Sequence, residues 1–317
     1  MGAKTALLIY AEGDARRALP DALQLDRAAT DALVARLLPG LDVVPVGDGS
    51  LDSAVNPPAG LLYAGVFPGL TIICDADLGE IRPADLRPSW LAEGSGRRVI
   101  LHSMHSGSDF LGFAVWTADG TQERALCLNP ARGIVEDHGN RLPFEQSYWA
   151  GRHPVEPDDE DDEPYPLPFH PLDLGEEALA ALCGFAIEGT PPDGMPDPDL
   201  VPLAGYRRGA PKLTLERSHG RPIPQPSALD VESQVQRLGD GLDYLIVDRG
   251  GEHYLQAAAG GRHDVPARKF QVERREGGPD RHFRCEVDAL EEVAQIFRGY
   301  LEDPDDRGDR TWEQIWL

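Results

Sequence analysis

The hydrophobic pattern is clearest between Val99 and Thr117, where two apolar runs enclose a polar segment. Val99–Leu101 and Phe110–Trp116 are almost wholly apolar, which is typical of strands covered on both faces. The segment between them, His102–Asp109, is rich in His, Ser and Asp. We therefore predict a strand, a polar turn and a second strand. Polar groups at the end of a buried strand are where α/β proteins commonly bind ligands.

Similar patterns predict the other elements of the first 190 residues. Apolar residues at helical spacing predict helices at Leu25–Leu38, Arg82–Leu91 and Glu176–Ile187. Short apolar runs predict strands at Thr5–Tyr10, Asp42–Val46, Leu61–Phe67, Leu70–Cys74 and Glu123–Leu128. We expect a loop at Asn129–Arg141, and a solvated loop at the acidic run Asp158–Glu163.

A different pattern begins at Ala228. A helix at Leu229–Leu238 is followed by four short strands and a helix that starts after Asp288; the strands are Leu242–Asp248, Glu252–Ala259, Arg268–Arg275 and Asp280–Glu286. Residues 191–226 are rich in Pro and Gly and are interpreted as a linker, in which Leu203–Tyr206 and Lys212–Glu216 are candidates to fold back onto the first domain. The predicted class is α+β: a mixed-sheet α/β domain at 1–190 and a smaller antiparallel domain at 227–317, built as helix, four strands and helix.

Composition narrows the range of partners. The 317 residues include 54 acidic and 30 basic ones, for a net charge of −24. Nucleic acid is not expected as a partner, because phosphate binding needs a basic surface. A basic protein partner suits the acidic surface, although acidity also serves solubility alone. No apolar run approaches 18 residues, so no membrane span is expected. The four cysteines are far apart, which favours free thiols in a reducing cytoplasm.

The candidate chemistry lies near the polar turn. His102, His105 and Asp109 are candidate catalytic residues, and Asp75 and Asp77 end a nearby predicted strand. With the two histidines, these two aspartates are candidate ligands of Zn²⁺ or Mn²⁺. The signatures H-E-x-x-H and G-x-S-x-G are both absent, and H-x-x-H alone is a weak signal. On a strand, two histidines three apart would face opposite ways. The alternative is therefore that His102, His105 and Asp75 only form hydrogen bonds at the ends of buried strands. No cofactor is firmly predicted.

Two parts of the chain resemble known families. The first 190 residues are similar to an uncharacterised actinobacterial family, through MGAKTALLIYAEGD, NPPAGLLYAGVFPG, VILHSMHSGSDFLGFAVW and YPLPFHPL. The last 90 residues resemble immunity-type domains of bacterial polymorphic toxin systems, through YLQAAAGG, VERREGGPDRHFR and a final helix followed by Trp312 and Trp316. Arg274 stands where such domains usually have Tyr. The second resemblance implies binding and blocking of a toxin without catalysis.

Two functions from different classes follow. The first is a non-catalytic, immunity-like binding protein that contacts a basic protein, such as a toxin, through its second sheet. The binding residues expected for it are Tyr254, Arg274, Arg275, His282 and Trp312. The second is a metal-dependent hydrolase that uses the His102/His105 turn with Asp75 and Asp77. It requires these side chains to converge.

Overall fold

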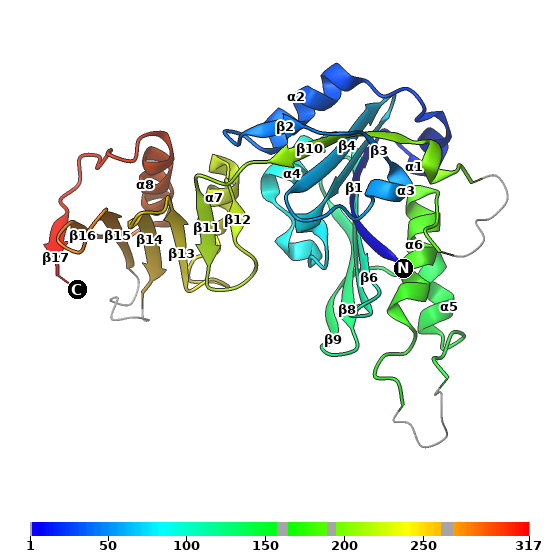
Figure 1. Cartoon of the computed structure of the whole chain (residues 1–317). Coiled ribbons are helices and arrows are strands. Elements are labelled where there is room, and N and C mark those ends of the chain that lie inside the picture. The colour runs from blue at the N-terminus through cyan, green and yellow to red at the C-terminus, as the bar shows by residue number, and fades with distance from the viewer. Residues whose placement is uncertain (1, 157–163, 189–194, 261–268, 317) are drawn as a thin grey trace. The chain divides into compact units, whose positions relative to one another are not determined.

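The computed structural model describes residues 2–156, 164–188, 195–260 and 269–316, so the acidic run Asp158–Glu163 lies outside the described residues. The chain divides into two units, each built on its own sheet (Figure 1). The first unit comprises Met1–Leu37, Asp42–Leu86 and Trp90–Gly209, and the second comprises Leu38–Leu41, Arg87–Ser89 and Ala210–Leu317.

The first sheet has ten strands among the described residues, in the order β2-β10-β4-β5-β1-β6-β7-β8-β9, with β3 beside β10. They are β1 (Lys4–Ala11), β2 (Val43–Pro45), β3 (Gly49–Ser50), β4 (Leu61–Phe67), β5 (Leu70–Asp75), β6 (Arg98–His105), β7 (Phe110–Trp116), β8 (Gln122–Asn129), β9 (Gly133–Gly139) and β10 (Pro202–Arg208). The α+β class is confirmed, but this sheet is antiparallel in its described pairings rather than mixed. The tight turns after β4, β6, β7 and β8 are too short for the crossover that parallel neighbours need.

The helices of this part of the chain are short except for α2 and α6. They are α1 (Ala15–Ala18), α2 (Arg27–Leu37), α3 (Leu51–Ala54), α4 (Pro88–Glu93), α5 (Gln146–Trp149) and α6 (Pro171–Cys183). The 3-10 turns are η1 (Leu19–Asp21), η2 (Ala76–Leu78), η3 (Pro83–Asp85), η4 (Pro143–Glu145) and η5 (Pro198–Leu200). Helix α6 begins five residues before the predicted helix, because His170 caps it and Pro171 suits its first position. It ends at Gly184, whose φ of 86° is left-handed.

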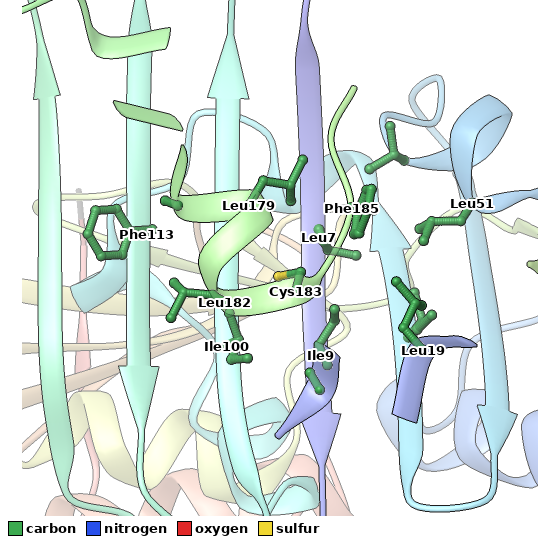
Figure 2. Packing of buried hydrophobic residues seen from close by; sticks show 14 of the residues in the cluster. Leu7, Ile9, Leu19, Leu51, Ile100, Phe113, Leu179, Leu182, Cys183 and Phe185 are labelled. Carbon is green, nitrogen blue, oxygen red and sulfur yellow. The ribbon is translucent and has the colours of Figure 1, made fainter. Parts of the chain in front are cut away.

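Helix α6 covers one face of the first sheet. Figure 2 shows Leu179 and Leu182 of α6 packed over Leu7 of β1, Ile100 of β6 and Phe113 of β7. Each apolar side chain buried in this way contributes about 1.5–3 kcal/mol. The opposite face carries Tyr10, whose hydroxyl donates to the carbonyl of Trp90 at 2.7 Å. The sheet is therefore covered on both faces here, as the continuous apolar runs predict.

Two expectations for irregular segments are wrong. Asn129–Arg141 contains β9, an edge strand whose mostly exposed, polar residues carry no strand-like apolar alternation. The stretch 191–226 is also more than a linker, since β10 pairs with β4 inside the first sheet. Leu203–Tyr206 thus folds back onto the first unit as predicted. Lys212–Glu216 does not, because its strand belongs to the second sheet.

The second unit is a sheet with helices on one face. Its seven strands within the described part of the chain run in the order β12-β11-β13-β14-β15-β16-β17. They are β11 (Thr214–Arg217), β12 (Ile223–Pro224), β13 (Tyr244–Asp248), β14 (His253–Ala259), β15 (Phe270–Glu276), β16 (His282–Val287) and β17 (Glu313–Ile315). Helices α7 (Ala228–Val235) and α8 (Leu290–Glu302) pack together over one face. The predicted order of helix, four strands and helix is confirmed, and β11, β12 and β17 extend the sheet at its edges.

Candidate functional site

The two histidines of the polar segment lie in strand β6, before the turn. The strand continues to His105, so the turn itself is only 106–109. His102 and His105 are three residues apart on an extended strand and therefore point to opposite faces of the sheet. The convergence that a metal or acid–base site would need from this pair does not occur.

His102 is a buried structural residue. Its Nδ1 lies 2.7 Å from Thr5 Oγ1 and its Nε2 lies 2.9 Å from the carbonyl oxygen of Gly175 in α6. A carbonyl only accepts, so Nε2 carries the hydrogen and Nδ1 accepts from the threonine hydroxyl. Complete burial lowers the pKa of this imidazole from 6.5 to about 4. Both ring nitrogens are engaged, and the neutral ring ties α6 to the sheet.

The turn brings other polar groups together. Ser108 donates to Glu80 Oε1 at 2.5 Å, and its Oγ also lies 3.4 Å from His105 Nδ1. Asp109 has a left-handed φ of 45°, and its Oδ2 lies 3.6 Å from Nε2 of His170. These residues form a half-exposed polar cluster. In a catalytic triad the histidine lies between the acid and the serine, whereas here Ser108 lies between Glu80 and His105.

The predicted aspartates face away from His102. Cys74 and His102 both lie opposite Leu7 of β1 in the sheet register, so these three share a face. Asp75, the next residue, therefore points to the other face. Within the described ranges, no group of three or more His, Cys, Asp or Glu side chains is placed to hold a metal ion. Among the described residues, His102 and Asp75 therefore do not converge as the hydrolase hypothesis requires.

Asp75 and Asp77 instead hold a residue that sequence reasoning missed. Arg208, at the end of β10, lies 3.2 Å from Asp75 Oδ1 and 2.6 Å from Asp77 Oδ2 through the same nitrogen. Asp75 Oδ1 also accepts from the backbone N–H of Asp77 at 2.8 Å. Asp75 is fully buried, and a buried carboxylate needs such a partner. No local sequence signal links residues 133 positions apart; only the place of β10 in the sheet does.

The expected binding residues of the second unit divide between the two faces of its sheet. Tyr254, Arg275 and His282 lie in register on the face opposite the helices, here called the open face. Tyr254 and Arg275 reach its surface, whereas His282 is fully buried beneath the Tyr254 ring, edge to face with centroids 5.9 Å apart. Burial lowers the pKa of His282. Only part of the predicted set is therefore accessible to a partner.

Arg274 and Trp312 lie on the helix side. Arg274 is buried and donates to the carbonyl oxygens of Asp306 at 2.6 Å and Pro304 at 2.7 Å. Its guanidinium also lies 5.6 Å from the centre of the Trp312 ring, in a cation–π arrangement. Burial lowers the pKa of Arg274. These contacts hold the segment between α8 and β17 in place; Arg274 is buried there, whereas Trp312 is half-buried.

Glu273 organises the centre of the open face, and sequence reasoning did not single it out. Its carboxylate accepts from Gln256 at 2.7 Å, Gln271 at 2.6 Å and Arg284 Nε at 2.9 Å. Its Oε2 also lies 3.2 Å from His282 Nε2. Four groups from three strands thus converge on one carboxylate. The sequence does not reveal this cluster, because only the register of β14, β15 and β16 brings these polar side chains beside Glu273.

A shallow hollow surrounds this carboxylate. It has a volume of about 410 Å³ and is lined by Tyr244, Ile246, Gln256, Ala257, Ala258, Gln271, Glu273 and Arg284. Among the residues that the structure describes, α7 and α8 pack only on the opposite face. The open face thus offers aromatic, aliphatic and charged groups around a fixed centre.

Comparison with known proteins assigns the first unit. Residues 5–206 match the model of a family of unknown function, DUF6928. The chain belongs to this family. The DUF6928 match ends inside β10, so it covers nearly all of the first sheet and leaves residues 207–317 outside. No curated protein and no solved structure gives a significant match. In the described part of the chain, no helix combines the length and apolar character needed to cross a bilayer.

Proposed function

We propose that this DUF6928 protein is a non-catalytic, immunity-like binding protein of the cytoplasm, whose second unit binds a basic protein such as a toxin. The observation that carries the proposal is the open face, a preorganised sheet surface with a hollow at its centre. The free, buried state of all four cysteines supports a reducing compartment.

Rigidity favours the open face as a binding surface. The side chains around Glu273 are held by hydrogen bonds across β14, β15 and β16. These side chains would therefore lose little conformational entropy when a partner binds. Tyr244 and Ile246 flank this centre, and a central aromatic or aliphatic anchor with a polar surround is the usual composition of an interface hot spot.

Charge favours a basic partner. Acidic side chains outnumber basic ones on the open face, where the strand register places Glu216, Asp248, Glu273, Glu286 and Glu313 against Arg275 and Arg284. The chain as a whole carries −24. Opposite charge raises association rates and selects among partners. A nucleic acid or an anionic membrane surface would instead be repelled.

Site-specific photocrosslinking in the source organism tests the proposal. A benzophenone amino acid replaces Ala258 in the hollow, and in a matched control replaces Leu229, which is 44% exposed on α7. We expect a basic protein to be crosslinked from position 258 and not from position 229. Equal yields from both positions would show that the open face is not the interface.

The crosslinked partner is then purified and its Kd measured by calorimetry. Ile246→Arg places a positive charge in the hollow, and Leu229→Arg makes the same change on the helix side. We expect the first variant to bind at least about a hundredfold more weakly, because like charges and lost apolar contact both oppose binding. The second should bind like the wild type. An unchanged Kd for Ile246→Arg would overturn the proposal.

A further inference from the structure

A second feature lies wholly within the first unit. A cavity of about 630 Å³ opens where strands β1 and β7 end and strands β6 and β8 begin. Ile100, Leu142, Phe144 and Leu182 supply its apolar wall, and Figure 2 shows Leu182 beside Ile100 beneath α6. The volume is within the range of about 300–1,000 Å³ that small-molecule sites occupy.

Two glycines mark open space at the rim of this cavity. Gly13 and Gly96 both line it, and a Cβ added at either would meet no atom within 4 Å. Both have left-handed φ values, of 95° and 79°, which favour glycine at these positions. No neighbouring side chain fills the entrance at these two positions.

The acidic group on one side of the rim is already occupied. Asp14 caps α1 and accepts from the backbone N–H of Arg16 at 3.1 Å. Its two oxygens also accept from the Arg16 side chain at 3.0 and 2.7 Å. A cationic ligand would have to displace this bidentate pair. The Asp14 side of the rim therefore does not favour a cation.

Arg98 differs in having hydrogen-bond capacity to spare. Its side chain points to the same face of β6 as Ile100, two residues later, and so toward the cavity. A guanidinium has five N–H donors. Among the described residues Arg98 makes one ion pair, with Glu123 at 3.2 Å, and the two side chains are 36% and 40% exposed. Ion pairs this exposed contribute little, so a ligand can replace Glu123 at small cost.

We propose that this cavity binds a small amphipathic anion. Its apolar body lies against Ile100, Phe144 and Leu182, and its acidic head accepts hydrogen bonds from the Arg98 guanidinium. The proposal concerns the first unit and is independent of the protein interface proposed for the open face.

A pair of fluorescent dyes separates the two parts of this recognition. The probe is 8-anilinonaphthalene-1-sulfonate, and its comparison is N-phenyl-1-naphthylamine, which has the same rings without the sulfonate. The full-length protein is titrated with each dye. Because the net charge of −24 repels an anion, nonspecific electrostatic attraction does not favour binding of the sulfonate. We expect saturable binding of both dyes, with the sulfonate bound more tightly.

Three variants locate the binding. Arg98→Gln should weaken sulfonate binding about ten- to a hundredfold and leave the neutral dye unchanged, since it removes one charge-assisted contact. Ala181→Phe, which fills the cavity from α6, should abolish binding of both dyes. Arg132→Gln changes an exposed arginine that does not line the cavity and should have no effect. Circular dichroism confirms that each variant is folded.

Several results would overturn the proposal. Absence of saturable binding by the wild type would show that the cavity does not take amphipathic molecules. Unchanged sulfonate binding in folded Ala181→Phe would place the dye elsewhere. Equal weakening of both dyes by Arg98→Gln would show that Arg98 shapes the cavity instead of binding the anionic head.

Discussion

Burial of His102 should make the first unit sensitive to acid. The imidazole is fully buried and neutral, and its pKa falls from 6.5 to about 4 through desolvation. The folded protein therefore binds this proton more weakly than the unfolded chain does. Its contribution to stability is fully present above pH 6.5 and is lost progressively as the pH falls toward 4, where the folded ring also becomes protonated.

The size of the effect follows from the two pKa values. Between about pH 7.5 and about pH 5, proton uptake by the unfolded chain alone should lower the free energy of unfolding by about 2 kcal/mol. Urea unfolding of the wild type and of His102→Gln at both pH values measures this difference. The variant lacks the titrating ring, so it should lose about 2 kcal/mol less than the wild type over the same interval.

Ile100→Val is the matched control, because it lies on the same strand and the same sheet face. It should cost about 0.5–1.5 kcal/mol at either pH and keep the wild-type dependence on pH. It also identifies which unfolding transition belongs to the first unit. Equal acid sensitivity in wild type and His102→Gln would refute the assignment of His102 as a buried neutral residue. So would an NMR titration of the folded protein that shows this ring protonated above pH 6.

Three further predictions concern the fold. Glu145→Ala should lower the free energy of unfolding by about 3–5 kcal/mol in urea titrations, because it leaves the fully buried Arg124 without its bidentate partner; a loss below about 1 kcal/mol would contradict this. Gly184→Ala should cost about 1–3 kcal/mol and lower Tm, because φ is 86° and the new Cβ would lie 2.9 Å from the Arg16 Cα, and an unchanged Tm would argue against it. Arg274→Gln should speed amide hydrogen exchange in the segment between α8 and β17, and unaltered exchange there would show that the arginine does not hold this segment.

The hydrophobic pattern predicts the elements whose burial is regular, either on both faces of a strand or along one face of a helix. Strands β6 and β7 are continuous apolar runs, and α8 has a clear apolar stripe, so their positions follow from sequence alone. Strand β9 was missed because an edge strand exposed on most of its residues has no alternation to detect. For β10 the sequence predicts only that Leu203–Tyr206 folds back onto the first domain. The strand itself is not predicted, because its flanks are rich in Pro and Gly and its partner β4 lies far away in the chain. Local pattern carries no information about such pairing.

The candidate site depended on information that sequence lacks. The hydrolase hypothesis brings His102 and Asp75 together because each lies near the end of a predicted strand. Whether they do depends on strand order and on which face each residue occupies, and a shift of one residue reverses the face. Here β1 separates the two strands, and the side chains point to opposite sides of the sheet.

Two kinds of polar group can be distinguished when a binding site is sought. In one kind, hydrogen bonds within the protein already engage the donors and acceptors; in the other, some donors or acceptors remain available to a ligand. His102, Asp75 and Arg274 are buried, and the fold engages their polar atoms, so their chemistry is structural. Arg98 and the rim of the hollow around Glu273 are partly exposed, with the partners of Arg98 few and replaceable. Besides apolar contact, a ligand gains hydrogen-bond free energy mainly from polar groups whose existing partners are few and exposed. The cavity under α6 and the open face of the second sheet are therefore where binding should be sought.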